Sequence, residues 1–171
     1  VMIAVSVAKV LGIANETIKE VVEGFTGVEH RIEFVRELDG VRYYNDSKGT
    51  NVDSTLKAID TMKRPTVLIL GGSDKKTCFD PLAQAVVNSG RISACVLIGD
   101  TADQIREALL SVGYTAISMA GYDFDACLAV CREKAAEGGC VLLSPACASF
   151  DMFKDYEDRG RIFKEKVMAL K

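Results

Sequence analysis

Apolar residues recur at helical spacing through residues 1–28. The opening stretch VMIAVSVAKVLG ends on Gly12, a residue typical of helix ends, and predicts a first helix. Asn15 comes before a second pattern with the same period and is the expected N-cap of an amphipathic helix that ends at Gly24 or Gly27. A chain that opens inside an apolar helix is expected to continue a longer protein, so residues 1–28 are predicted to be the remnant of a preceding domain.

The pattern changes after residue 30. The runs IEFVREL and VRYYND surround Asp39-Gly40, a dipeptide favoured in tight hairpin turns, and predict two antiparallel strands. A helix is expected from Asn51 to about Met62. Downstream, short apolar runs alternate with helical patterns. The expected strands are 66–70, 95–99, 115–119 and 140–143, and the expected helices are 81–88, 102–111, 125–136 and 153–170.

Alternating strands and helices imply right-handed crossover units and a mostly parallel sheet that helices cover on both faces. The predicted fold is therefore α/β: a Rossmann-like, doubly wound sheet with an antiparallel hairpin at its start, preceded by two helices. Glycines interrupt the helical pattern between residues 24 and 29, so the domain boundary is placed there, with 29–171 as the second domain.

Composition narrows the class of protein. The 171 residues are 49% hydrophobic and 26% charged, which is typical of a globular domain. The net charge is −3 and the 21 basic residues are scattered, which argues against a nucleic-acid partner. Apolar runs are far shorter than the roughly 20 residues that span a bilayer, so no membrane contact is expected and the cytoplasm is the default location. The six cysteines form no C-x-x-C pair, which predicts free thiols and no metal site.

Three polar segments directly follow predicted strands, where open α/β sheets bind their ligands. NDSKGTN (45–51) suits a phosphate or ribose, although Asp46 or Thr50 could equally be helix caps. GGSDKKT (71–77) is glycine-rich but matches neither nucleotide fingerprint, so Lys75 or Lys76 meets either an anion or solvent.

SPACASF (144–150) carries Ser149, which suits a carboxylate ligand. A serine nucleophile is disfavoured because G-x-S-x-G is missing and the single histidine is His30. Arg31, beside it at the predicted boundary, can meet a phosphate in an interdomain cleft or form a surface ion pair.

Taken in order, the segments HR (30–31), NDSKGTN (45–51), LILGGSDK (68–75) and LLSPACASFDMFKDYEDRG (142–160) resemble the C-terminal domain of the Mur ligases, and among these the members that add D-glutamate. The resemblance covers nearly all of 29–171. Other Mur ligases and folylpolyglutamate synthetase share the architecture but carry different motifs at the DSKGTN and SPACAS positions.

The resemblance implies an ATP-dependent ligase of peptidoglycan precursor synthesis, which joins D-glutamate to UDP-N-acetylmuramoyl-L-alanine through an acyl phosphate. It implies that residues 1–28 end a central ATPase domain, and that the P-loop and the Mg²⁺ ligands lie upstream of residue 1. Arg31, Asp46 and Lys48 would contact ATP or ADP, with Lys48 also the catalytic residue beside the transferred phosphoryl group. The residues implied to surround D-glutamate are Thr50, Lys75, Ser149, Phe150 and Tyr156.

Two other classes compete with the ligase. A Rossmann-type oxidoreductase is disfavoured because G-x-G-x-x-G follows none of the expected strands. A non-catalytic module that binds a small molecule or a protein is left open by composition alone.

Overall fold

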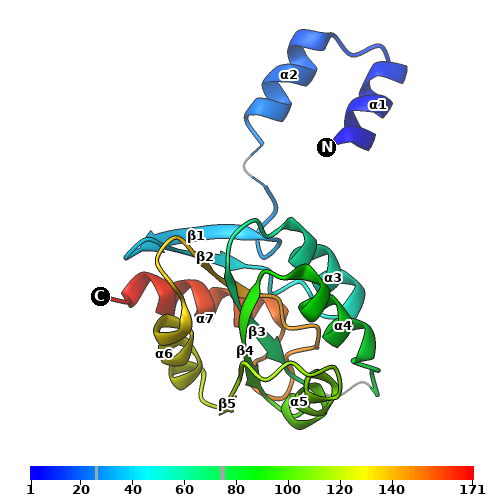
Figure 1. The fold of residues 1–171 in the computed structure, drawn as a ribbon. Helices are drawn as coiled ribbons and strands as arrows, with labels where there is room; N and C mark the ends of the chain where they lie inside the picture. The colour runs from blue at the N-terminus through cyan, green and yellow to red at the C-terminus, as the bar shows by residue number, and fades with distance from the viewer. Residues whose placement is uncertain (26, 74–75) are drawn as a thin grey trace.

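The computed structural model describes residues 1–25, 27–73 and 76–171 (Figure 1). Two helices, α1 (Met2–Val10) and α2 (Asn15–Glu23), precede an α/β body. The strands of the body are β1 (Glu33–Leu38), β2 (Val41–Asn45), β3 (Thr66–Gly71), β4 (Ile92–Ile98), β5 (Ile117–Gly121) and β6 (Cys140–Leu143). Its helices are α3 (Val52–Thr61), α4 (Asp80–Ser89), α5 (Ala102–Ser111), α6 (Phe124–Lys134) and α7 (Tyr156–Ala169).

The six strands form one sheet in the order β1-β2-β6-β3-β4-β5. β1 and β2 are antiparallel, and every other neighbouring pair is parallel. Helices α3, α4 and α5 supply the core on one face of the sheet, while α6 and α7 supply it on the other (Figure 1). The predicted doubly wound sheet with an N-terminal hairpin is confirmed.

Strand β3 shows why the body needs two layers of helices. Val67 and Ile69 pack in the cluster with α6 and α7, whereas Leu68 and Leu70 pack in the cluster with α3, α4 and α5. Successive side chains of a strand point to opposite faces, so a strand that is apolar throughout must be covered on both sides. All four side chains are fully buried.

The hairpin turns at Asp39-Gly40, as predicted. Asp39 has φ 52° and Gly40 has φ 74°. Positive φ at both central residues matches the type I′ turn, whose twist suits the flanking strands, and short polar residues and glycine tolerate it best.

Several predicted boundaries and caps were wrong. Asn15 is the first helical residue rather than the N-cap of α2, which is Ala14 without a side-chain cap. Neither Asp46 nor Thr50 caps α3, because Asn51 accepts a hydrogen bond from the amide of Ser54 at 2.9 Å. The helix expected from 153 begins at Tyr156, and β5 lies two residues later than predicted.

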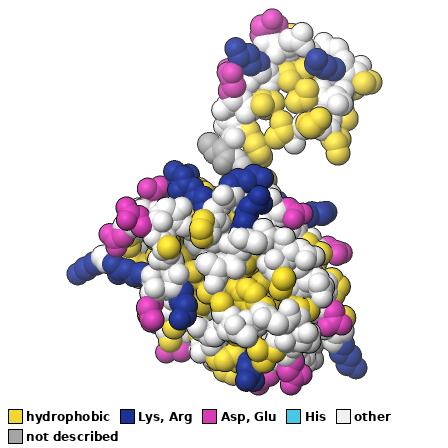
Figure 2. All heavy atoms as spheres, viewed as in Figure 1, with side chains coloured by type: hydrophobic (Ala, Val, Ile, Leu, Met, Phe, Trp, Pro, Cys, Tyr) yellow, Lys and Arg dark blue, Asp and Glu magenta, His cyan; other side chains and the backbone are white. Residues whose placement is uncertain are grey.

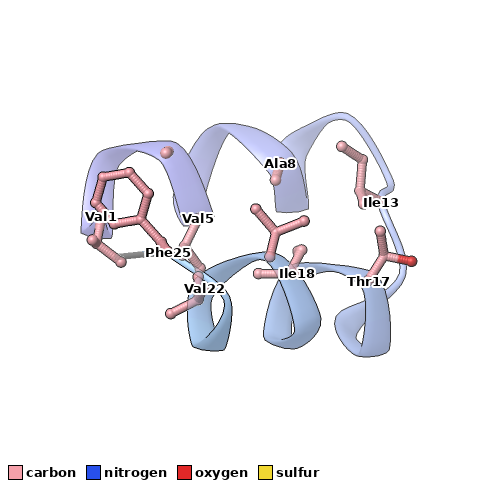
Figure 3. Close-up of a pocket in the computed structure, with 10 residues that line it drawn as sticks. Val1, Val5, Ala8, Ile13, Thr17, Ile18, Val22 and Phe25 are labelled. Atoms are coloured by element: carbon pink, nitrogen blue, oxygen red, sulfur yellow. The ribbon is translucent and has the colours of Figure 1, made fainter. Parts of the chain in front are cut away.

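Helices α1 and α2 have no buried residue. Apolar side chains line a groove between the two helices (Figure 3), and the space-filling view shows them gathered on the pair (Figure 2). Met2 is 84% exposed and Val10 is 87% exposed.

All six cysteines are free, which confirms the expected thiols, and only Cys78 among them is exposed. Burial raises the pKa of the Cys95 thiol to about 12. Within the described ranges, no helix has the length and apolar character that a bilayer span requires.

Candidate functional site

The three predicted loops meet at the carboxyl edge of the sheet. Strands β2 and β3 both pair with β6, so the loop after β6 lies between the other two. Backbone hydrogen bonds join them: the Asp46 amide donates to the Leu143 carbonyl at 2.7 Å, and the Gly71 amide donates to the Pro145 carbonyl at 2.8 Å. This edge is where open α/β sheets bind ligands.

Asp46 is buried beneath the first loop. One carboxylate oxygen accepts the backbone N–H of Ile32 at 3.2 Å, and the other accepts the hydroxyl of Ser144 at 2.7 Å. Burial raises the pKa of the Asp46 carboxyl, and these two hydrogen bonds and the charge of Arg31 oppose the rise. Asp46 therefore joins the hairpin, its own loop and the loop after β6.

Arg159, on α7, is a fully buried arginine that holds two of the loops together. Its guanidinium donates to the hydroxyl and the carbonyl of Ser47, each at 2.9 Å, and to the carbonyls of Cys147 and Ala148 at 3.2–3.3 Å. Burial lowers the pKa of Arg159 to about 10, so the side chain remains charged at neutral pH. Planar guanidinium donors suit this convergence of oxygen acceptors.

His30 anchors the point where the chain enters the body. The Ser47 amide donates to Oδ1 of Asn45 at 3.1 Å, which directs Nδ2 of Asn45 to Nδ1 of His30 at 2.9 Å. Because Nδ2 is a donor, Nδ1 of His30 accepts and the ring proton of the neutral form lies on Nε2. A Cβ at Gly160 would lie 2.2 Å from Nδ1 of His30, so α7 needs a glycine at this contact.

Lys48 and Tyr156 contact each other beside this anchor. Nζ of Lys48 lies 5.6 Å from the ring centroid of Tyr156, within the range of a cation–π interaction. The Lys48 amide donates to the His30 carbonyl at 3.0 Å, so Lys48 lies beside the residue that precedes Arg31. Arg31 is exposed and Lys48 is half-buried. Two cations in one corner fit nucleotide phosphates, whereas both oxygens of Asp46 already accept protein hydrogen bonds.

Ser149 differs from the other buried polar side chains of the described residues. Its side chain is buried, and its hydroxyl has no hydrogen-bond partner within the described residues. Buried polar atoms without a partner are rare in folded proteins and cost stability, so each one calls for an explanation. Phe150 comes next and is 71% exposed, so an apolar ring lies in solvent beside the unpartnered hydroxyl.

The loop after β3 is only partly described. Lys75 lies outside the described residues, while Lys76 is exposed with φ 55°. Thr50 is half-buried at the end of the first loop, and its amide donates to the Lys48 carbonyl at 2.9 Å.

The structure thus brings Arg31, Asp46, Lys48 and Tyr156 into one corner, and places Ser149 and Phe150 on the adjacent loop. Residue-by-residue analysis of the sequence missed the buried groups that support them. His30 and Asn45 lie inside the quoted segments, as do Ser144 and Arg159, but polar residues that become buried look the same in a sequence as exposed ones.

One cluster of side chains near His30 contains residue types that bind metals, but a lysine of the same chain contacts its carboxylates. Ligand atoms of Glu29, His30 and Glu33 lie within 4.8 Å of one another. The ammonium of Lys164 contacts both carboxylates, so a cation of the chain already balances them.

Comparison with known proteins identifies the family of this chain. The family described as "Mur ligase, glutamate ligase domain" matches residues 30–147. Proteins named UDP-N-acetylmuramoylalanine–D-glutamate ligase are 48% identical in Thermoanaerobacter sp. (strain X514), over 98% of this chain, and 45% identical in Clostridioides difficile (strain 630), over 99%. The chain covers 37% of the length of each relative.

Solved structures show the same fold at low sequence identity. The UDP-N-acetylmuramate-alanine ligase MurC of Thermotoga maritima aligns over 98% of this chain and 36% of its own, with a TM-score of 0.71 and 18% identity. The MurF ligase of the same organism, solved with ADP, aligns over 96% of this chain and 36% of its own, with a TM-score of 0.60 and 13% identity. By its family match, which covers more than half of its residues, the chain belongs to the Mur ligase family and carries the glutamate ligase domain of that family.

Proposed function

We propose that this chain is the C-terminal part of an ATP-dependent, cytoplasmic ligase that joins D-glutamate to UDP-N-acetylmuramoyl-L-alanine in peptidoglycan precursor synthesis. The names of relatives that are 43–48% identical along nearly the whole chain support this substrate pair. In the reaction, a terminal carboxylate attacks the γ-phosphate of ATP and ADP leaves. The amine of D-glutamate then attacks the acyl carbon, phosphate leaves, and the amine loses a proton as the amide forms.

The observation that carries the proposal is the buried hydroxyl of Ser149, which has no hydrogen-bond partner among the residues that the structure describes. A buried hydroxyl at the ligand edge that lacks a protein partner is explained if an oxygen or nitrogen of the amino acid becomes its partner. In this account D-glutamate lies against Ser149 and the main chain of Phe150. The other groups around it are Thr50, Tyr156 and Lys75, whose ammonium would balance a carboxylate.

Arg31 and Lys48 form the nucleotide side of the site. The ammonium of Lys48 lies over the ring of Tyr156, and its amide contacts the residue before Arg31, so Lys48 is the catalytic residue proposed to stabilise charge on the transferred phosphoryl group. Asp46 acts in support, because its two oxygens hold the hairpin and the loop after β6. Bound ATP with Mg²⁺ would supply the phosphoryl group and the charge neutralisation, and the Mg²⁺ ligands are expected in the preceding part of the enzyme.

Residues 1–28 are proposed to belong structurally with the preceding domain. Helices α1 and α2 bury none of their own residues, and their groove is lined by apolar side chains (Figure 3). The body from residue 29 onward has a complete two-layer core without them.

Amide formation by the full-length enzyme tests the proposal. With ATP, Mg²⁺ and UDP-N-acetylmuramoyl-L-alanine, mass spectrometry should find a product with D-glutamate and far less with L-glutamate or other amino acids. The 171-residue chain alone should release no ADP above background, because phosphoryl transfer needs a P-loop and metal to position ATP. Product with a different amino acid would favour another Mur-type or folylpolyglutamate-type ligase. If no product forms and the protein binds NADH, a Rossmann-type oxidoreductase would be favoured. If no product forms and neither NADH, ADP nor D-glutamate binds, a non-catalytic module would be favoured.

A further inference from the structure

Asp151 joins three loops at the carboxyl edge of the sheet. It follows the SPACASF segment, and its hydrogen bonds reach the loop after β3 and the loop after β4. The Asp151 amide donates to Oγ of Ser73 at 2.8 Å, and that hydroxyl donates back to Oδ1 of Asp151 at 3.2 Å. The other oxygen, Oδ2, accepts the amide of Asp100 at 3.0 Å.

The space around this carboxylate is closed by glycines. A Cβ on Gly99 would lie 2.0 Å from Oδ2 of Asp151, and a Cβ on Gly72 would lie 2.1 Å from the Ala148 carbonyl oxygen. Gly99 has φ 70° and Gly72 has φ 147°, conformations that side chains rarely permit. The three loops therefore approach one another more closely than residues with side chains would allow, and the Asp151 carboxylate fills the space between them.

This contact bears directly on Ser149. Ser73 also donates its amide to the Ala148 carbonyl at 3.0 Å, in an isolated antiparallel bridge one residue before Ser149. The Ser149 carbonyl in turn accepts the amides of Met152 and Phe153, at 3.1 and 2.8 Å. The turn that carries Ser149 is thus fixed by two sets of hydrogen bonds. Ser73 holds the residue before Ser149, and the amides of Met152 and Phe153 hold the Ser149 carbonyl. Asp151 lies within this turn and contacts Ser73.

We propose that Asp151 is a positioning residue for the amino-acid substrate. Both of its oxygens accept protein hydrogen bonds, so it acts by setting the distance between Ser149 and the loop that begins at Ser73. Asp151 thereby fixes Ser149 relative to Ser73, the last described residue of the glycine-rich segment after β3. The inference rests on the proposed function and adds a residue that contacts no substrate.

Steady-state kinetics of the full-length enzyme, with each substrate varied in turn, tests the role. Asp151→Ala should raise the KM for D-glutamate about tenfold, equivalent to about 1.4 kcal/mol, while the KM for ATP stays within about twofold. Asp151→Asn should raise the KM for D-glutamate less. The asparagine Oδ1 can still accept the hydrogen bond from Ser73, but its NH2 group would face the Asp100 N–H, and two donors cannot form a hydrogen bond. Ser73→Ala should raise the same KM, and the double variant with Asp151→Ala should be no worse than the worse single variant.

Asp123→Ala is the matched control. Asp123 also accepts two backbone amides, those of Asp125 and Ala126, but it does so at the start of α6 and joins no loops. The Asp123→Ala variant should lower thermal stability about as much as Asp151→Ala does, and should leave the KM for D-glutamate and the KM for ATP unchanged. Asp151 would be merely structural if its variants lowered stability as the control does without changing the KM for D-glutamate, or raised both constants equally. Failure of the proposed function is distinguishable, because the wild-type enzyme would then not use D-glutamate at all.

Discussion

The helical pair and the α/β body use similar apolar residues with opposite results. In α1 the large side chains remain in solvent, with Ile3 82% exposed, whereas in β3 every side chain from Thr66 to Gly71 is buried. The difference lies in what surrounds each element. Strand β3 has helices on both faces, while α1 and α2 line a shared groove and have no buried residue.

Apolar content therefore does not predict a core unless a second layer covers it. Two helices of nine residues each are shorter than isolated helices need to be stable in water, and most helix stability comes from packing. The body supplies that packing for its own helices, whereas α1 and α2 line a shared groove and have no buried residue. On this comparison, the buried core of the body is expected to account for most of the stability of the chain.

The same truncation, leucine to alanine, tests whether the body and the helical pair differ in their contribution to stability. Leu68→Ala removes a fully buried side chain between two layers and should cost about 2–5 kcal/mol of unfolding free energy. Leu11→Ala, at a leucine that is 72% exposed, should change it by less than about 0.5 kcal/mol. Urea denaturation of the 171-residue chain measures both. Comparable losses at the two positions would mean that the pair contributes to the folded core.

The same contrast can be drawn between two arginines of α7. Arg159→Ala leaves the carbonyls of Ser47 and Cys147 without their donor in a buried place, and should destabilise the chain by about 2–4 kcal/mol. Arg161→Ala removes only exposed ion pairs with Asp158 and Glu165, and no measurable change is expected. Thermal denaturation of both variants tests this, and a tolerated Arg159→Ala would contradict the role of Arg159 as the link between the loops.

Two serines of one loop, Ser144 and Ser149, differ in hydrogen bonding: among the described residues the hydroxyl of Ser144 has partners and that of Ser149 has none. Ser144→Ala removes the hydroxyl that donates to Asp46, and should destabilise the unliganded chain by about 1 kcal/mol or more. Ser149→Ala removes a buried hydroxyl that has no partner in the described part of the chain, and should raise stability by about 1 kcal/mol. Chemical denaturation without ligand compares them, and a loss at both positions would show that Ser149 has a structural partner.

The smallest effect expected is the pH dependence that Asp46 contributes. Burial raises its pKa in the folded chain, so its contribution to stability is fully present below the ordinary pKa of 3.8 and is lost as the pH rises through the folded value. Asp46→Asn removes this titration. The unfolding free energy of the wild type minus that of the variant should therefore fall between pH 4 and pH 7, and a difference that rises over this range would contradict the burial argument.

Sequence patterns predicted most of the fold because local chemistry decided it. The apolar run of β3 and the Asp39-Gly40 turn left few alternatives, and strand–helix alternation determined the parallel topology. Caps were less predictable, because Asn15 and Asn51 are chemically alike and only the path of the chain decides that Asn51 caps a helix.

The proposed site residues and the groups that support them differ in how far the sequence could reveal them. Arg31 and Lys48, which are exposed and half-buried, lie in loops that open the body or directly follow a strand. Its supports are long-range: Arg159 reaches Ser47, 112 positions earlier in the chain. Such contacts depend on packing between α7 and β2, and no spacing in the sequence encodes them.

The most direct test of the central claim is the kinetic effect of Ser149→Ala in the full-length ligase. If the Ser149 hydroxyl is the partner of D-glutamate, the variant should raise the KM for D-glutamate by roughly ten- to a hundredfold, since hydrogen bonds to charged groups contribute about 1.5–3 kcal/mol. The KM for ATP should stay within about twofold. An unchanged KM for D-glutamate, or an equal rise for both substrates, would contradict the assignment of this edge of the sheet to the amino acid.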